Sequence, residues 1–273
     1  MEPRLQRRVQ RYGWDLAADD YETLWQAQLA DAQTRMLARV ALQPGEHVLD
    51  VACGTGLVTL QAARAAGPPG RVIGVDLSGR MVQAAEQRAR ASALHNVRFD
   101  RMDAEQLALA DASSDVVLCA LGLMYIPEPE QAVREMVRVL RPGGRVGLAV
   151  WGERERCGWW PLFSIVDAEV SSEVCPLFFR LGQADTLTGL CADAGLVNVR
   201  RERLPGTLQY ADGEEACRAA FAGGPVALAW SRFGDAARAR ACARYLDAIA
   251  PWRSGSGYAV PVEFLIVTGC KPS

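Results

Sequence analysis

A short apolar run that ends in a glycine turn is the feature that most constrains how this chain can fold. Val48–Val51 is typical of a buried strand, and Gly54 and Gly56 follow it closely. Glycine lets the backbone turn tightly and lets a ligand lie against it. The apolar positions after the turn recur at the spacing of one helix face: Leu57, Leu60 and Ala63. The stretch therefore predicts a strand, a ligand-binding turn and a helix.

Strand and helix patterns continue to alternate along the chain. Four further strand-like runs follow the first: Val72–Asp76, Val97–Phe99, Val116–Ala120 and Val146–Trp151. Helical spacing and short turns separate them, as in a parallel sheet with right-handed crossovers. Two later runs, Leu196–Leu204 and Val262–Gly269, flank a long segment with helical patterns. We therefore expect an α/β fold: a doubly wound, mostly parallel seven-stranded Rossmann-like sheet, with a helical cap inserted between the last two strands.

The pattern divides the chain into three regions. Residues 1–44 are expected to form an N-terminal helical lid, with helical spacing clear from Tyr21 and a break at Pro44-Gly45. Residues 45–151 hold the ligand-binding core. Residues 152–273 supply the substrate-cap segments and the last two strands of the same sheet.

Overall charge and cysteine spacing argue against several classes of function. The 273 residues carry a net charge of −2, whereas a dedicated nucleic-acid binder would be basic. The longest strongly apolar run, residues 116–126, is too short to cross a bilayer, and no signal peptide is evident. The eight cysteines are singletons, which is typical of reduced thiols and not of a zinc site. We expect a cytoplasmic protein without a metal site and leave its oligomeric state open.

Three acidic residues lie at the ends of three successive strands and point to the ligand. Asp50 precedes the glycines, where its carboxylate suits a positive amine or sulfonium better than a diphosphate. The last glycine of a dinucleotide fingerprint would fall at Thr59, so that motif is incomplete. Asp76 can accept both hydroxyls of a ribose, or it can simply cap the next helix. Asp103, with the amide of Ala104, can read the edge of an adenine.

Four runs carry a resemblance to a known family: VLDVACGTG, VIGVDLS, RMDAEQL and RVLRPGGRVGLAVW. Together they resemble the class I S-adenosylmethionine-dependent methyltransferases. Within that class they look like the branch that contains the ubiquinone/menaquinone-biosynthesis C-methyltransferases and many small-molecule enzymes. The resemblance covers about residues 45–151. These motifs are specific for the cofactor and carry little information on the substrate.

The resemblance implies S-adenosylmethionine as cofactor and assigns residues to it. Asp50 would orient the methionine amino group, Asp76 would hold the ribose, and Asp103 would read the adenine. The full implied set is Asp50, Ala52, Gly54, Gly56, Asp76, Leu77, Met81, Asp103, Ala104 and Leu121. Gly122 would lie with Leu121 near the methionine end.

Methyl transfer from a sulfonium is an in-line displacement that needs no metal, so alignment is the protein's main task. Aromatic faces near the methyl group stabilise the cation, and Tyr12, Trp14 and Tyr125 are the candidates. Ordinary helix packing explains each of them about as well, and explains Trp25 better. The two histidines, His47 and His95, fall at the wrong edge of the sheet for catalysis. A general base, if one is needed, would be Tyr125, Cys157 or an acid from the cap.

The acceptor pocket is expected outside the shared core. Aromatic residues concentrate in 1–25, 152–182 and 205–261: Tyr12, Trp14, Trp159, Trp160, Phe178, Phe179, Phe221, Trp230 and Tyr258. Such segments can cap the carboxyl edge of the sheet and define a pocket there. We therefore expect a small, largely apolar or aromatic acceptor. Whether carbon, oxygen, nitrogen, sulfur or selenium is methylated is left open.

Three other functions compete with this interpretation. An NAD-dependent oxidoreductase could use a related sheet, although Thr59 and Asp50 oppose it. A nucleic-acid or protein methyltransferase would carry an Asn/Asp-Pro-Pro-Tyr motif after the fourth strand, where Gly122-Leu123-Met124-Tyr125 stands instead. A protein that binds S-adenosylmethionine as a sensor or scaffold would keep the same binding motifs.

Overall fold

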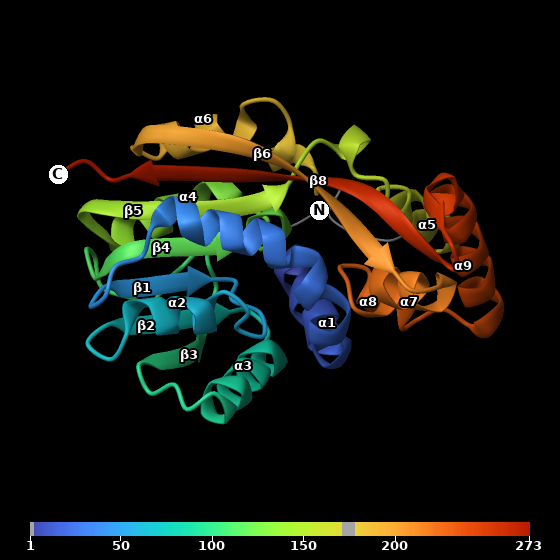
Figure 1. The fold of residues 1–273 in the computed structure, drawn as a ribbon, viewed down its shortest axis with the longest axis horizontal. Helices are drawn as coiled ribbons and strands as arrows, with labels where there is room; N and C mark the ends of the chain where they lie inside the picture. Colours follow the sequence, from blue (N-terminus) through green and yellow to red (C-terminus); the bar gives the residue numbers. More distant parts are fainter. Residues whose placement is uncertain (1–2, 171–177) are drawn as a thin grey trace.

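The computed structural model describes residues 3–170 and 178–273 and is built around one large sheet (Figure 1). Seven strands follow the order β3-β2-β1-β4-β5-β8-β6, and the two-residue β7 pairs with β8. Their bounds are β1 (His47–Val51), β2 (Arg71–Asp76), β3 (Val97–Arg101), β4 (Ser114–Ala120), β5 (Leu140–Trp151), β6 (Val197–Tyr210), β7 (Arg253–Ser254) and β8 (Gly257–Cys270). Part of the predicted segment 152–182, residues 171–177, lies outside the described residues.

The strand directions confirm the predicted fold class. The first five strands pair in parallel, and β8 runs antiparallel to both β5 and β6. The chain order reverses at β1, which has β2 on one side and β4 on the other. In such a sheet a crevice opens beyond the carboxyl ends of the strands at the reversal. This is where the predicted acids lie.

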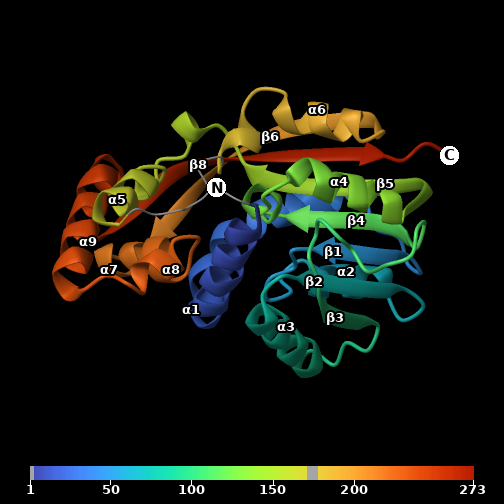
Figure 2. The same cartoon turned by 180° about the vertical axis from the view of Figure 1, so that it is seen from behind.

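Helices cover both faces of the sheet. Their bounds are α1 (Pro3–Val40), α2 (Thr59–Ala66), α3 (Gly79–Ala91), α4 (Pro129–Val139), α5 (Leu162–Glu169), α6 (Thr186–Asp193), α7 (Gly213–Cys217), α8 (Ala227–Trp230) and α9 (Asp235–Ile249). Helices α1, α2 and α3 lie on the face nearer the viewer in Figure 1. Helices α4 and α6 lie on the opposite face, nearer the viewer in Figure 2. The central strands are therefore buried on both sides, as their apolar sequences require.

The last two long strands exceed their predicted lengths. Strand β6 continues to Tyr210 and β8 begins at Gly257, and the two remain paired to their ends. Pro205 and Pro261 interrupt the apolar runs, so the sequence pattern stops at them. Both prolines are tolerated because β6 is an edge strand and β5 ends before it reaches Pro261. The paired strands carry the cap away from the rest of the sheet (Figure 1).

The cap has a small aromatic core of its own. It comprises residues 211–256 and includes α7, α8, α9 and β7. Phe221 stacks on Trp230 with ring centroids 4.7 Å apart and meets Tyr245 edge-on at 5.7 Å. Phe221 and Tyr245 are fully buried. These aromatic residues therefore hold the cap together and do not face the crevice.

Helix α1 is longer than its sequence pattern indicated. It is a single helix of 38 residues, whereas helical spacing is clear only from Tyr21. Its second half packs Met36 and Val40 into the core. Its first half is held by polar contacts to α3: Asp15 accepts a hydrogen bond from Ser78, and Asp19 pairs with Arg80. Polar partners on another element explain why residues 3–18 lack an apolar stripe.

Candidate functional site

A cavity of about 950 Å³, mouth included, lies at the carboxyl ends of β1, β2 and β4 beneath α1. Nine of the ten predicted cofactor residues line it: Asp50, Ala52, Gly54, Asp76, Leu77, Met81, Asp103, Ala104 and Leu121. The tenth, Gly56, does not. It has φ +83° and lies so close to α3 that a side chain there would press on Ala85. Gly56 therefore allows the helix to approach the turn.

Asp50 is buried at the end of β1, with 1% of the residue exposed. The hydroxyl of Thr59 donates a hydrogen bond to its Oδ2 at 2.6 Å. Burial raises the pKa of Asp50 to about 7, and the Thr59 hydrogen bond opposes that rise. Sequence reasoning treated Thr59 only as a missing glycine. Its position could have been informative, because Thr59 is a hydroxyl residue in the first turn of the helix that follows Asp50.

Asp76 organises the turn between β2 and α3. Its Oδ2 accepts a hydrogen bond from the amide of Gly54 at 2.9 Å, and its Oδ1 accepts one from the amide of Ser78 at 2.8 Å. The cap of α3 is Ser78, whose hydroxyl accepts from the amide of Met81. Burial raises the pKa of Asp76, and the two backbone hydrogen bonds oppose that rise. Asp76 thus links the glycine turn to the second strand and faces the cavity.

Two residues at the cavity have an uncommon backbone conformation. Ala52 follows β1 with φ 55°, and Leu121 follows β4 with φ 60°, both in the left-handed region. Neighbouring Gly122 is obligatory here, because a Cβ atom on it would lie 2.3 Å from the Cβ of Ala52. Strained positions of this kind cluster at ligand sites. The geometry brings the ends of β1 and β4 together at the floor of the cavity.

Asp103 lies at the other end of the cavity, where an arginine from α1 covers it. Arg7 Nε lies 3.2 Å from Asp103 Oδ2, and Arg7 also pairs with Glu105. Burial raises the pKa of Asp103, and the charge of Arg7 opposes that rise. No sequence pattern indicated that residue 7 would reach residue 103. These contacts place the start of α1 over the Asp103 end of the cavity.

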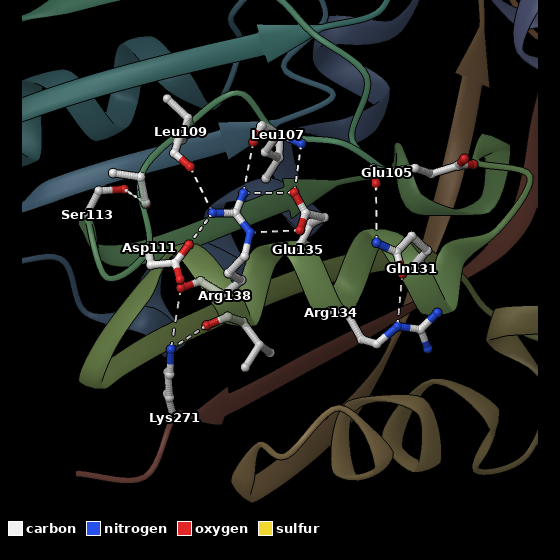
Figure 3. Close-up of polar contacts among 12 residues, drawn as sticks. Glu105, Leu107, Leu109, Asp111, Ser113, Gln131, Arg134, Glu135, Arg138 and Lys271 are labelled. Carbon is white, nitrogen blue, oxygen red and sulfur yellow. Dashed lines mark hydrogen bonds and ion pairs between the residues drawn. The ribbon is translucent and has the colours of Figure 1, made fainter.

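The loop that carries Asp103 is fastened to α4 by Arg138 (Figure 3). The guanidinium donates to the carbonyls of Leu107 and Leu109, each at 2.8 Å, and to Asp111 at 2.6 Å. Glu135 pairs with Arg138 and also accepts from the amide of Leu107 at 2.8 Å. Arg138 therefore satisfies two backbone carbonyls of this loop, and its partner Glu135 satisfies a backbone amide.

A second, much narrower cavity adjoins the first, with about 320 Å³ of free space when its mouth is included. Four residues line both: Trp14, Tyr21, Leu121 and Tyr125. The ring of Trp14 meets Tyr125 at 5.0 Å and Tyr21 at 5.7 Å, both edge-to-face. Two of the predicted catalytic candidates, Trp14 and Tyr125, are thus in contact at the junction of the two cavities.

Of the other aromatic residues expected near the acceptor, some line the smaller cavity and others do not. Trp25 and Trp159 line the smaller cavity, and Phe178 and Phe179 pack against Trp159. Tyr258 is buried in β8. Tyr12 and Trp160 are 46% and 39% exposed and line neither cavity. The catalytic candidate Tyr12 is therefore not brought to the site, because it is two residues from Trp14 and so faces another way on the helix.

The histidines and Cys157 lie outside both cavities. His47 is at the start of β1, where its amide donates to Asp115 at 2.8 Å, and His95 precedes β3. Cys157 is fully buried beside Glu263, and burial raises the pKa of its thiol to about 12. Of the bases named from sequence, Tyr125 is the one that lines the cavities.

Comparison with known proteins shows what the core is similar to. Residues 48–144 match a family model described as a methyltransferase domain. A demethylmenaquinone methyltransferase of Geobacillus stearothermophilus is 40% identical over 109 residues, which is 40% of this chain and 47% of that protein. The chain therefore matches about half the length of this curated relative.

Two solved structures share the fold. The YcgJ protein from Bacillus subtilis is 20% identical with a TM-score of 0.63, over 89% of this chain and 99% of that one. The [4+2]-cyclase SpnF is 23% identical with a TM-score of 0.58, over 89% and 80%. At these identities the likeness concerns the fold alone. Residues 48–144 of this chain, with their acids and glycine turn at the strand ends, are therefore similar to a methyltransferase domain.

Proposed function

We propose that the protein transfers a methyl group from S-adenosylmethionine to a small, largely apolar acceptor. One observation carries the proposal. Three carboxylates at three successive strand ends, Asp50, Asp76 and Asp103, line a cavity that opens onto a second, aromatic one. The first cavity suits a ligand with a positive charge, a ribose and an adenine, and the second suits an apolar acceptor beside it.

The residues of the larger cavity fit this cofactor and do not fit a dinucleotide. A diphosphate at the glycine turn would face Asp50 and Asp76, and carboxylates repel it. A positive amine or sulfonium compensates instead for the burial of Asp50. Asp76 would hold the ribose, Leu77 and Met81 would flank the adenine, and Asp103 would read its edge. S-adenosylmethionine, when bound, supplies an electrophilic methyl group on a positively charged sulfur.

The chain's own contribution is alignment. Leu121, Trp14 and Tyr125 lie at the junction of the cavities, where donor and acceptor would meet. Correct positioning of two reactants is worth roughly 7–11 kcal/mol, and an aromatic face near a cation adds about 0.5–2 kcal/mol. Helix α1 covers both cavities and would exclude water. Two tyrosines, Tyr21 and Tyr125, are the titratable groups common to both cavities. Burial raises the pKa of Tyr21, which disfavours it as a base, so Tyr125 is the candidate for an acceptor that must lose a proton.

Ligand binding gives the first test. S-adenosylhomocysteine at roughly a hundred times its dissociation constant should stabilise the fold by about 2.7 kcal/mol. A melting curve that NAD raises and S-adenosylhomocysteine leaves unchanged would overturn the proposal. The second step is to incubate the protein with methyl-labelled S-adenosylmethionine and fractions of small-molecule extract. Labelled product and S-adenosylhomocysteine should appear together in equal amounts.

A second candidate is a protein that binds the cofactor without methyl transfer. The likeness to a [4+2]-cyclase is the reason for considering this candidate, because that protein shares the fold and is named for a reaction other than methyl transfer. Stabilisation by S-adenosylhomocysteine without any labelled product across the extract would favour this candidate.

No helix among the described residues is long and apolar enough to cross a membrane. We infer a cytoplasmic enzyme, consistent with the unpaired cysteines of the described residues.

A further inference from the structure

Two cysteines from different helices meet in the cap. Cys217 is the last residue of α7 and is buried, whereas Cys242 lies within α9 and is partly exposed. Cys217 Sγ lies 4.0 Å from the carbonyl oxygen of Cys242. The thiol of Cys217 also forms a hydrogen bond with the thiol of Cys242. The two sulfur atoms are therefore neighbours, although 25 positions separate the residues along the chain.

This contact distinguishes the pair from the other cysteines. Cys53, Cys119, Cys157 and Cys191 are buried, and within the described part of the chain no hydrogen bond joins any of them to another cysteine. A single buried cysteine behaves as a small apolar side chain. Packing is a sufficient explanation for those four, whereas two adjacent thiols can also react with each other.

A pocket in the cap gives small molecules access to the pair. Its free space is about 620 Å³ when its mouth is included, and both cysteines line it, with Glu214, Trp230 and Leu246. Burial raises the pKa of the Cys217 thiol, and the hydrogen bond to Cys242 raises it further. Because the thiolate is the reactive form of a cysteine, the more exposed Cys242 would react first with an oxidant.

We propose that Cys217 and Cys242 form a site of reversible oxidation, at which hydrogen peroxide joins α7 to α9 through a disulfide bond. The peroxide converts the Cys242 thiol to a sulfenic acid and releases one water. The Cys217 thiol then attacks the sulfenic sulfur, so that the S–S bond forms and the sulfenic oxygen leaves as a second water. Two thiols are thus oxidised and one hydrogen peroxide is reduced. A dithiol reductant reverses the reaction by thiol–disulfide exchange.

The oxidised pair would act on the segment that joins the cap to helix α1. Cys217 is followed by a π-helical turn, Arg218–Ala222, and isolated turns of this kind are often found at functional sites. Arg218 pairs with Asp20 of α1 at 2.8 Å. Gly223, after the turn, lies so close to α1 that a Cβ atom on it would be 2.8 Å from Leu24 Cδ1. A disulfide bond at Cys217 would therefore restrain α1 through this turn.

Mass spectrometry of the full chain tests the site. The protein is treated with hydrogen peroxide and the remaining thiols are alkylated. The parent should lose two hydrogen atoms, and its digest should contain peptides that are linked through Cys217 and Cys242 and separated by dithiothreitol. Cys217→Ala and Cys242→Ala should each abolish this linkage. Cys270→Ala is the matched control, because Cys270 is also partly exposed but lies in β8, and it should preserve the linkage.

Hydrogen exchange then tests the restraint on α1. In the oxidised parent, amide exchange should slow about threefold or more in residues 213–222 and in residues 17–24. Dithiothreitol should restore the original rates. The Cys217→Ala variant, treated with peroxide in the same way, should show no slowing.

Absence of the linkage in the peroxide-treated parent would overturn the proposal, and so would a linkage between Cys242 residues of two copies. The parent alone gives this result, so it does not depend on how the variants fold. Unchanged exchange in residues 17–24 of the linked protein would overturn the restraint on α1. Neither measurement uses S-adenosylmethionine or an acceptor, so failure of this inference is distinguishable from failure of the proposed function.

Discussion

The hydroxyl of Thr59 donates a 2.6 Å hydrogen bond to the carboxylate of Asp50, and both residues are buried. Asp50 is the residue before the last in β1 and Thr59 begins α2, so the bond spans the glycine turn between them. Asp50 also lines the larger cavity. The same hydrogen bond therefore fixes the turn and holds an acid at the cavity.

Replacing Thr59 by valine should weaken binding of S-adenosylhomocysteine. The variant removes a hydrogen bond to a charged group, which is worth roughly 1.5–3 kcal/mol. We expect the dissociation constant to rise about tenfold, measured by calorimetry at pH 8, where Asp50 is ionised. Thr59→Ser retains the hydroxyl and should bind almost as tightly as the parent. Equal affinity in the valine and serine variants would show that the hydrogen bond has no part in binding.

Affinity for the positively charged cofactor should increase with pH. The pKa of Asp50 is raised to about 7, so near neutral pH part of the protein carries it protonated. Only the ionised form attracts an ammonium or sulfonium, and affinity should therefore rise through pH 7 and then level off. Below pH 7 the expected slope is about tenfold per pH unit. Calorimetry between pH 5.5 and 8.5 measures this change in affinity. In the Asp50→Asn variant, the affinity should no longer change near pH 7.

Stability of the free protein should change in the opposite sense with pH. A carboxyl whose pKa is raised on folding binds more protons in the folded state than in the unfolded state. Its contribution is fully present below the ordinary pKa of an aspartate and is lost as the pH rises through about 7. Asp50→Asn should flatten this part of the curve. Unfolding in denaturant at several pH values measures the free energy of unfolding. If this free energy changed with pH equally in the parent protein and in the Asp50→Asn variant, Asp50 would not be the group responsible.

Arg138→Met should destabilise the fold and loosen the loop that carries Asp103. The arginine donates to two backbone carbonyls, and its loss leaves Glu135 without its partner. We expect a loss of about 1–3 kcal/mol in the free energy of unfolding. Arg134→Met is the matched control on the same helix, since Arg134 is exposed and bonds only the side chain of Gln131 in Figure 3. Similar losses in the two variants would contradict this role.

Deletion of residues 1–18 should impair turnover more than folding. The deletion removes Arg7 and Trp14 from the cavities and keeps Met36 and Val40 in the core. We expect turnover, with an acceptor identified by labelling, to fall about tenfold or more because alignment is lost. Tyr12→Ala is the control, because Tyr12 is exposed on the same helix. Full turnover by the truncated chain would show that the lid assignment is wrong.

The parts of the fold that local pattern determines were predictable from the sequence. Apolar residues predominate in the central parallel strands, because strands buried on both faces require them, whereas the edge strand β3 was recognised from a short alternating run. Three acids lie at or just beyond the ends of β1, β2 and β3, so their meeting at one edge follows from the parallel direction of the strands. Nine of the ten cofactor residues implied by the family motifs line one cavity for the same reason.

The contacts that complete the site were not predictable from pattern. Arg7 reaches Asp103 across 96 positions of sequence, and no periodicity signals a pairing between single charged side chains. The start of α1 was missed because its partners are polar. The lengths of β6 and β8 were missed because Pro205 and Pro261 normally end strands, and only the edge position of β6 makes them acceptable.

The cap leaves the sheet after Tyr210 and returns at Gly257, and Tyr210 pairs directly with Tyr258. Its two ends are therefore neighbours in the β6–β8 ladder. Residues 211–256 can differ in length or sequence between these two ends without changing the pairing of β1, β2 and β3, the strands at whose ends Asp50, Asp76 and Asp103 lie. Of the described residues that line the smaller cavity, Gly224 and Pro225 belong to this segment, so such changes would alter one side of that cavity and leave the three acids in place.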